Sequence, residues 1–351
     1  MTRADTIRLA TIGTSSITER FAAAVIDADA AGDGIRIDVA FSRDAERGRA
    51  FADRIGAPHA ATDFDALLHS GDVDAVYVGS PNGAHADQAR RAIAAGVHVF
   101  LEKPATPTAE EFAELVQLSR EHGVVVFEGM RNVYDPGLQR VAELLPQVGP
   151  VRLVSFGQSQ YSARYDLVLR GETPNIFDPK LSGGAVFDLG VYPLSALVHL
   201  LGAPASVAGH LVEIATGADG AGAAVLGYPD AVAQVAFSKI GVSHRPNEIQ
   251  GEWGTIEFDE VTAPREIALS LRARGGAAAV RTAEHVEASA NNMVYEVRRF
   301  AALVRGEDPA ADQARTLAVL RIVETLRRNG APSTTHTETT HDETTHDERG
   351  A

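Results

Sequence analysis

The stretch that decides the fold of this chain is IRLATIGTSSIT, at residues 7–18. A short apolar run typical of a buried strand leads into a glycine, and a segment with the spacing of a helix follows. The same alternation continues to about residue 130. We expect strands at residues 7–12, 35–41, 75–78, 97–101 and 124–127, and helices at residues 17–30, 45–55, 84–95 and 109–122. Strands that alternate with helices predict a parallel sheet covered on both faces, which is the doubly wound α/β fold.

Beyond residue 150 the pattern changes to short strands, several of which are separated by tight turns. We expect strands at residues 151–160, 206–215, 223–228, 231–240, 248–251, 255–258 and 266–272, and helices at residues 132–148, 185–201, 294–305 and 314–329. Strands joined by tight turns predict an antiparallel sheet. The predicted fold class is therefore an N-terminal doubly wound parallel sheet, residues 1–130, plus a C-terminal α+β domain with a large, mainly antiparallel sheet, residues 131–330.

The composition excludes several classes of protein. The 351 residues carry a formal net charge of −15 and contain no cysteine, so disulfide scaffolds, cysteine nucleophiles and thiolate metal sites are excluded. An acidic chain with scattered arginines is a poor candidate for binding nucleic acid, which calls for a basic patch. No apolar run approaches the roughly 20 residues of a membrane helix, and the first residues lack the pattern of a signal peptide. We expect a cytoplasmic protein with no membrane or nucleic-acid partner.

The end of the chain, residues 331–351, reads as a separate acidic segment rich in threonine and histidine. From Thr334 onward it has no apolar residue before Ala351. Such a segment buries too little surface to offset its ordering entropy, so we expect a disordered tail. Its histidines offer at most a loose metal contact, and no metal site is expected.

The turn after the first strand has part of the pattern of a dinucleotide-binding turn, Gly-x-Gly-x-x-Gly. In that pattern the glycines allow a tight turn, close approach of the backbone to a pyrophosphate, and close packing of helix on strand. Only Gly13 is kept here, while Ser15 and Thr18, which are small and carry hydroxyl groups, stand at the other two positions. An ordinary strand–helix turn is the alternative. The expected phosphate-binding residues are Gly13, Thr14, Ser15, Ser16 and Ile17.

The end of the second strand predicts which dinucleotide binds. NAD-binding folds usually place Asp or Glu there for the ribose 2′-hydroxyl, whereas NADP-binding folds carry an arginine nearby. This strand ends in Ser42 and Arg43, with Asp38 inside the strand and Asp44 after the arginine. We expect Ser42 and Arg43 to bind a 2′-phosphate, which favours NADP(H) over NAD. The alternative is that Arg43 is only a surface charge at a helix start.

Three further motifs carry side chains suited to chemistry. SPNGAH at residues 80–85 and EKP at residues 102–104 follow expected strands at their carboxyl ends, where ligands bind in such sheets. GGAVFDLGVYP, at residues 183–193, opens the first long helix after residue 150. If this segment is an α-helix, Asp188 and Tyr192 share one face, because they are four residues apart.

In their order and spacing these motifs resemble the Gfo/Idh/MocA family of oxidoreductases, over nearly all of residues 6–330. Many inositol dehydrogenases of that family have histidine where this chain has Tyr192. The tyrosine is similar to the branch of glucose–fructose oxidoreductase, the dimeric dihydrodiol dehydrogenases and the NADP-linked aldose dehydrogenases. The resemblance implies an NADP(H)- or NAD-dependent oxidoreductase that transfers a hydride to or from a sugar, a cyclic polyol or a related diol or carbonyl. The chain departs from the family at the second glycine of the turn.

The resemblance also implies roles for individual residues. Lys103, Asp188 and Tyr192 are the expected catalytic residues. A free tyrosine titrates at about pH 10, and a nearby ammonium such as Lys103 favours the phenolate, so we expect Tyr192 to act as acid and base. Asp188 would orient a substrate hydroxyl or hold Lys103. The expected cofactor contacts near the nicotinamide are Ser80, Pro81, Asn82, His85, Glu102 and Lys103, with Glu102 alternatively a structural partner of Lys103, and the expected substrate contacts are Arg131, Asn132, Tyr161 and Asn175.

Two other functions stay open at this point. A few relatives bind NAD(P) and act as regulators without catalysis, and some use a tightly held NAD to hydrolyse glycosides. The second sheet should have one face free of helices, and such faces commonly pair in this family. We therefore expect a homodimer or a larger homo-oligomer, with the second domain serving both substrate binding and oligomerisation.

Overall fold

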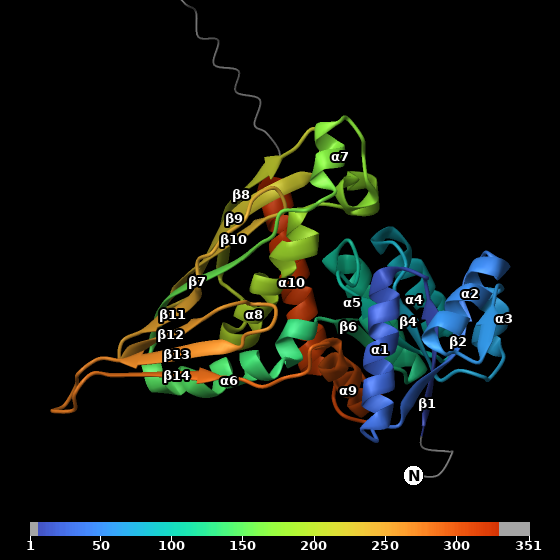
Figure 1. Cartoon of the computed structure of the whole chain (residues 1–351), viewed down its shortest axis with the longest axis horizontal. Coiled ribbons are helices and arrows are strands. Elements are labelled where there is room, and N and C mark those ends of the chain that lie inside the picture. The colour runs from blue at the N-terminus through green and yellow to red at the C-terminus, as the bar shows by residue number, and fades with distance from the viewer. Residues whose placement is uncertain (1–5, 330–351) are drawn as a thin grey trace, which may run out of the picture.

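The computed structural model describes residues 6–329, and in it the chain forms two sheets, each with its own helices (Figure 1). The N-terminal sheet has six parallel strands in the order β3-β2-β1-β4-β5-β6. Its elements are β1 Ile7–Ile12, α1 Ser16–Ala30, β2 Ile35–Phe41, α2 Ala45–Ile55, β3 His59–Ala61, α3 Phe64–His69, β4 Ala75–Val78, α4 His85–Ala94, β5 His98–Glu102, α5 Ala109–His122 and β6 Val126–Gly129. The predicted doubly wound sheet is confirmed, and β3 and α3 are additions to it.

The centre of this sheet determines where a ligand can bind. β1 lies between β2 and β4, and the chain winds outward from it in both directions. At such a point the connections diverge, and a crevice opens at the carboxyl ends of the two central strands. All of β4 is buried, as is expected for a strand covered on both faces. The turn after β1 and the segment after β4 therefore meet at the same edge.

The second sheet has eight strands in the order β14-β13-β12-β11-β7-β10-β9-β8. Among its described strands only β7 and β10 run parallel, so the predicted, mainly antiparallel sheet is confirmed. Its strands are β7 Val151–Ser159, β8 Ser206–Glu213, β9 Asp219–Gly227, β10 Val232–Ser238, β11 Asn247–Gly251, β12 Gly254–Phe258, β13 Glu266–Leu271 and β14 Val280–His285. The strand β14 was not predicted from the sequence.

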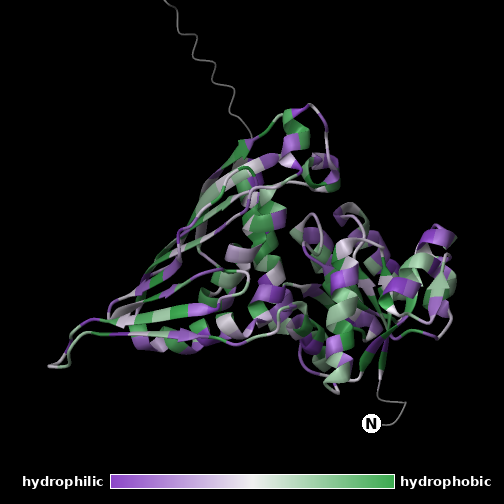
Figure 2. Ribbon diagram, viewed as in Figure 1, coloured by the Kyte–Doolittle hydropathy of each residue, from purple (hydrophilic) through white to green (hydrophobic). Residues whose placement is uncertain are grey.

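Helices cover one face of this second sheet. α6 Pro136–Leu144, α8 Val191–Leu201 and α10 Ala310–Asn329 lie against it, and in the described part of the chain the other face carries no helix (Figure 1). The short helix α7 Tyr165–Leu169 lies beyond the end of β7. The stretch Pro179–Leu201, whose hydropathy is coloured in Figure 2, is long and apolar enough to pass for a membrane span. Of its 18-residue apolar window, however, 78% is buried inside the protein. Such burial is typical of a core helix.

The last helices cross back over the domain boundary. α9 Met293–Val304 packs on α1 and β6, and its side chain Phe300 meets the ring of Phe100 at 5.3 Å between centroids. Residues 131–330 were expected to form one domain, but α9 belongs to the N-terminal core. A helix has the same spacing of apolar residues whether it packs on the first sheet or on the second. The sequence pattern therefore does not indicate which sheet α9 covers.

Two predicted helices differ in detail. The connecting helix was expected within residues 132–148 with its start near Asp135 and Pro136, and α6 begins there, because Asp135 caps it by accepting a hydrogen bond from the Gly137 N–H and Pro136 occupies the first helical position. The residues on either side of α6 form the turns Arg131–Tyr134 and Leu145–Val148 instead of α-helix. The helix expected at residues 185–201 begins as a π-helical turn, Val186–Gly190, before α8. The predicted tail, residues 331–351, lies outside the described residues.

Candidate active site

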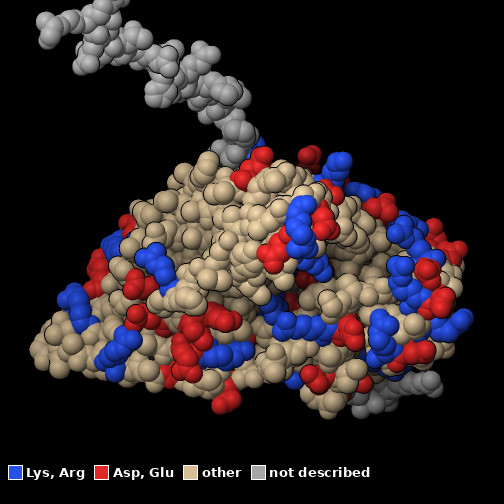
Figure 3. All heavy atoms as spheres, turned by 45° about the horizontal axis from the view of Figure 1, so that its top comes forward, with Lys and Arg blue, Asp and Glu red and all other residues tan. Residues whose placement is uncertain are grey.

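A cleft of about 460 Å³ lies where the carboxyl edge of the N-terminal sheet faces the second domain. The space-filling view shows a hollow on this side of the molecule, with basic and acidic side chains at its rim (Figure 3). Eleven of the predicted site residues line the cleft: Ser15, Ile17, Ser80, Pro81, Asn82, Glu102, Lys103, Arg131, Asn175, Asp188 and Tyr192. Residues separated by almost 180 positions in the sequence thus share one cavity.

The turn between β1 and α1 forms a cradle for phosphate. Gly13 has φ of +116°, and a Cβ atom there would lie 2.7 Å from the carbonyl oxygen of Gly79. α1 begins at Ser16, and the side chain of Ser15 makes no capping hydrogen bond, so the first N–H groups of the helix point toward the cleft edge without a partner from this side chain. Unpaired N–H groups at a helix start attract anions. These residues fit the pyrophosphate of a dinucleotide.

The end of β2 leaves an arginine available beside this turn. The carboxylate of Asp38 accepts hydrogen bonds from Arg36 at 2.6 and 2.9 Å, and that of Asp44 caps α2. Arg43 is exposed, and no ion pair to it is formed within residues 6–329. Ser42 is buried, and its hydroxyl oxygen accepts a hydrogen bond from the Asp44 N–H. Both nearby carboxylates are therefore engaged, while the guanidinium group is not.

Lys103 and Asp188 form an ion pair across the cleft. The Lys103 Nζ donates to Asp188 Oδ1 at 3.0 Å and to the Asp188 carbonyl oxygen at 2.9 Å. Burial alone would lower the pKa of Lys103, but the charges of Asp188 and its other neighbours outweigh burial and raise it. Burial would likewise raise the pKa of Asp188, but two lysines hold it well below its usual range. Both groups are charged at neutral pH.

Tyr192 lies between two cations. Its side chain is 6% exposed, and its hydroxyl oxygen accepts a hydrogen bond from Arg131 Nε at 3.3 Å. The Lys103 Nζ lies 5.0 Å from the centre of the ring, over its face rather than at its hydroxyl. The closest basic group to the hydroxyl is thus Arg131, which was expected only as a substrate contact. Because the guanidinium occupies a lone pair, the O–H of Tyr192 is free to point into the cleft.

The π-helical turn sets the position of Asp188. Gly184, just before it, has φ of +140°, and a Cβ atom there would lie 2.1 Å from Asp219 Oδ1. The carboxylate of Asp219 accepts a hydrogen bond from the Val186 N–H at 2.6 Å and so fixes the start of the turn. The glycine at this position is therefore required by the close approach of β9.

Glu102, which lines the cleft, belongs to a group of buried carboxylates. It accepts a hydrogen bond from the Tyr77 hydroxyl at 2.8 Å, whereas Lys103 pairs with Asp188. Burial raises the pKa of Glu102, and burial together with the charge of Glu102 raises that of Glu296 well above its usual range. The Glu296 Oε2 has no hydrogen-bond partner in the described chain. The positive charges of Arg131 and Arg20 act on both of these acids.

Several predicted residues do not line the cleft. His85 is fully buried, and its ring nitrogens contact the carbonyl oxygens of Ser80 and Pro104, so it supports the motif from behind rather than reaching the cavity. Asn132 is also buried, and it donates to the carbonyl oxygens of Tyr192 and Val261. Tyr161 is exposed, and its hydroxyl bonds Asp166. The others outside the cavity lining are Gly13, Thr14, Ser16, Ser42 and Arg43, which surround the turns at its edge.

Sequence reasoning missed two basic residues of the site. Arg20 lines the cleft from the second turn of α1, and Lys239 contacts the far side of Asp188. The feature of the sequence that could have indicated Lys239 is that lysine is rare in it: the only lysines are Lys103, Lys180 and Lys239. In the described residues no group of three or more His, Asp or Glu lies together as a metal site would require.

Comparison with known proteins agrees with this geometry. The family model described as "Oxidoreductase family, NAD-binding Rossmann fold" matches residues 7–130, and that described as "GFO/IDH/MocA C-terminal domain" matches residues 146–257. The scyllo-inositol 2-dehydrogenase (NADP(+)) of Bacillus subtilis is 34% identical over 325 residues, which are 92% of this chain and 96% of that protein. The D-xylose 1-dehydrogenase (NADP(+)) 2 of Haloferax volcanii is 32% identical over 81% of this chain and 86% of that protein.

A solved structure has the same fold. The 3-ketoreductase KijD10 from Actinomadura kijaniata, in complex with NADP and TDP-benzene, matches with a TM-score of 0.79 and 26% identity over 93% of this chain and 98% of that one. The chain therefore belongs to the Gfo/Idh/MocA oxidoreductase family. It is an oxidoreductase with a Rossmann domain for a nicotinamide dinucleotide.

Proposed function

We propose that the protein is an NADP(H)-dependent oxidoreductase of a sugar, a cyclic polyol or a related diol or carbonyl. One observation carries this proposal: Lys103, Asp188, Arg131 and Tyr192 meet in the cleft that begins at the phosphate-binding turn. When bound, the nicotinamide ring accepts or supplies the hydride. The names of the two similar dehydrogenases support the substrate class, since one acts on scyllo-inositol and the other on D-xylose.

Each charged residue has a distinct task in this proposal. The Tyr192 hydroxyl gives its proton to the substrate oxygen in reduction and takes it back in oxidation, and Arg131 holds its oxygen in place. The ammonium of Lys103 donates to the substrate oxygen and stabilises the negative charge that develops there. Asp188 keeps Lys103 charged and directed toward the cleft. Arg164 and Asn175, which line the cleft from the second domain, hold the remaining hydroxyl groups of the substrate.

The preference for NADP over NAD rests on the end of β2. An exposed guanidinium at Arg43, without a carboxylate partner in the described chain, matches the charge of a 2′-phosphate. The carboxylates that an NAD ribose would use are engaged, Asp38 by Arg36 and Asp44 by the start of α2. Both dehydrogenases named above carry NADP(+) in their names.

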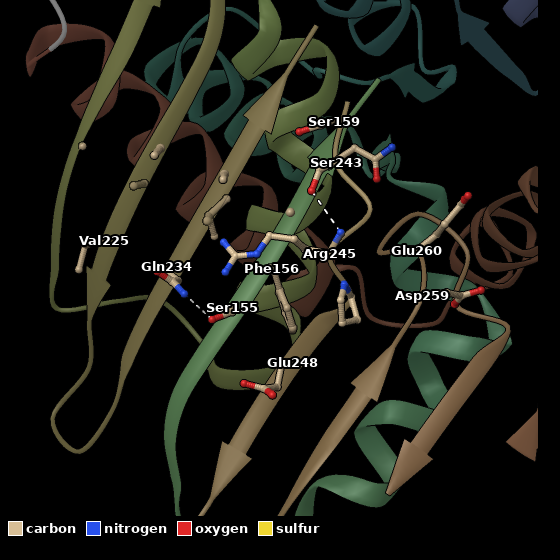
Figure 4. Close-up of a pocket in the computed structure, with 18 of the residues that line it drawn as sticks. Ser155, Phe156, Ser159, Val225, Gln234, Ser243, Arg245, Glu248, Asp259 and Glu260 are labelled. Carbon is tan, nitrogen blue, oxygen red and sulfur yellow. Dashed lines mark hydrogen bonds between the residues drawn. The ribbon is translucent and has the colours of Figure 1, made fainter. Parts of the chain in front are cut away.

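We also propose that the protein is a homodimer through the open face of the second sheet. That face presents the exposed side chains Val212, Val225 and Val232, and a groove of about 610 Å³ crosses it (Figure 4). Around the valines the face is built of small residues, among them Ala208, Ala223 and Ala236, which allow a second sheet to approach closely. A second copy of the chain is the occupant that this face fits best, because its exposed valines and small residues can pair with the same residues of the copy.

The experiment is an NADP-linked screen of aldoses, inositols and diols with the wild-type protein and the Tyr192→Phe variant. We expect turnover of at least one member, and a loss of about 100-fold or more in kcat for the variant, because phenylalanine keeps the ring but has no proton to transfer. NADPH binding, followed by fluorescence titration, should be unchanged. Unchanged turnover by the variant would refute the role of Tyr192. Tight NADPH binding without turnover of any compound would favour a non-catalytic nucleotide-binding protein.

A further inference from the structure

Lys239 is a buried lysine directly behind the proposed site. It follows β10 immediately, and its side chain is almost wholly enclosed, with the residue 3% exposed. Its main chain is held on both sides, since its N–H donates to the Gly220 carbonyl oxygen at 2.8 Å and its carbonyl oxygen accepts from the Ser162 N–H at 2.9 Å. A lysine is almost never enclosed in this way without a charged partner.

The partner is the carboxylate that also holds Lys103. The Lys239 Nζ contacts Asp188 Oδ2, while the Lys103 Nζ contacts Asp188 Oδ1 at 3.0 Å. The two oxygens of one carboxylate are thus divided between two ammonium groups. One ammonium comes from the N-terminal domain, after β5, and the other from the second sheet, after β10.

Within residues 6–329, Lys239 forms no ion pair other than the one with Asp188. The ring of Phe177 lies on its other side, 5.4 Å from Nζ to the ring centre. Besides Asp188, the charged groups that act on it are Lys103 and Arg164, and both repel it. Lys103 and Lys239 therefore share a single carboxylate, and the contact with Asp188 is what keeps Lys239 in place.

From this arrangement, and resting on the function proposed above, we propose that Lys239 is a positioning residue for the reaction. By occupying Oδ2 it holds the carboxylate of Asp188 so that Oδ1 faces Lys103, and Lys103 then stays over the ring of Tyr192 with its one remaining N–H group toward the substrate. Lys239 itself does not line the cleft. Its effect on the reaction passes through Asp188.

The test is Lys239→Met, which keeps the length of the side chain and removes the ammonium. Asp188 keeps Lys103 as a partner, so its negative charge stays paired with one cation. We expect kcat to fall about 10- to 100-fold, since small misplacements of catalytic groups cost this much. KM for NADPH and the melting temperature should change little. Lys180→Met, the same substitution at an exposed lysine, is the matched control.

The pH profile separates positioning from a structural role. Burial lowers the pKa of Lys239 more than Asp188 raises it, so Lys239 loses its proton at lower pH than an exposed lysine does. Above that pH the side chain at position 239 is uncharged in the wild-type protein, as it is in the Lys239→Met variant. The ratio of wild-type kcat to Lys239→Met kcat should therefore shrink toward one as the pH rises. A ratio that grows with pH would contradict the proposal.

Two further measurements keep the test decisive. In an Asp188→Asn background, Lys239→Met should lower kcat no further, because the carboxylate that Lys239 positions is gone; an equal loss in both backgrounds would overturn the proposal. A crystal structure of Lys239→Met gives a reading without turnover: we expect the carboxylate to rotate away from Lys103, and an unchanged contact would refute the proposal. If the wild-type protein turns over no compound, the proposed function fails, whereas an active wild type with an equally active variant contradicts only the role of Lys239.

Discussion

At the scale of single residues, the site depends on where the chain uses lysine instead of arginine. Of its 32 basic residues three are lysines, and two of these contact Asp188. An ammonium group is a compact charge that fits opposite one carboxylate oxygen, whereas the planar guanidinium of arginine spans both. Two ammonium groups can therefore share one carboxylate, as Lys103 and Lys239 do. Arginine serves where a broad donor is suitable, as Arg131 does between Tyr192 and Asn292.

Arg43 gives the prediction at this scale. The Arg43→Ala variant should bind NADPH about 10- to 100-fold more weakly, because a hydrogen bond to a charged group contributes about 1.5–3 kcal/mol. Its affinity for NADH should be unchanged, since NADH has no 2′-phosphate to lose a contact. Fluorescence titration with both cofactors measures the two affinities. Equal affinity of the wild-type protein for NADPH and NADH, or tighter binding of NADH, would overturn the assigned preference.

At the scale of elements, most of the fold was predictable, because buried parallel strands and amphipathic helices leave clear periodic patterns. The elements that were missed are short or exposed, such as β3 with three residues and β14, whose side chains are mostly exposed. The motifs placed Lys103, Asp188 and Tyr192 in one cleft. The roles of Arg131 and Lys239 were not predictable, because both depend on contacts between segments more than 50 residues apart. The π-helical turn follows from the approach of Asp219, which no local pattern reveals.

The turn between β1 and α1 gives the prediction for an element. Gly13→Ala places a Cβ atom 2.7 Å from a backbone oxygen at a φ of +116°, so the turn must shift. We expect a loss of about 1–3 kcal/mol in the free energy of unfolding, together with NADPH binding weakened by about tenfold or more. Thermal unfolding and fluorescence titration measure the two effects. Gly83→Ala is the stability control, because its added Cβ meets nothing within 4 Å, and equal stability of the two variants would contradict the argument.

At the scale of the whole molecule, the two sheets differ in how they are covered: in the described chain helices cover both faces of the first sheet but only one face of the second (Figure 1). The helices α6, α8 and α10 cover one face of the second sheet (Figure 1), and none of the residues that line the active-site cleft lies in a strand of that sheet. The proposed pairing of two open faces therefore leaves both clefts accessible. Hydrophobic burial between the two open faces would stabilise the dimer without involving the residues of the active site.

The prediction for the whole molecule is a dimer that a single charge disrupts. Val225→Glu places a carboxylate on the open face, at a side chain that is 52% exposed in one chain. We expect light scattering to give a dimer for the wild-type protein and a monomer for this variant. Ile26→Glu, at a position 56% exposed on α1, is the control and should remain a dimer. A monomeric wild-type protein would refute the proposed pairing.

The return of α9 to the first domain has a consequence for how the chain is made. During synthesis the rings of Phe21 and Phe100 lack the packing partners that Met293–Val304 provides. This helix leaves the ribosome only after all described strands of the second sheet. Until then an apolar surface beside α1 stays open to solvent and to other nascent chains. Until α9 is made, the nucleotide-binding half lacks one of the helices that pack on its core. A fragment that ends near residue 130 should expose this surface and aggregate, so both halves reach their final packing together, at the end of translation.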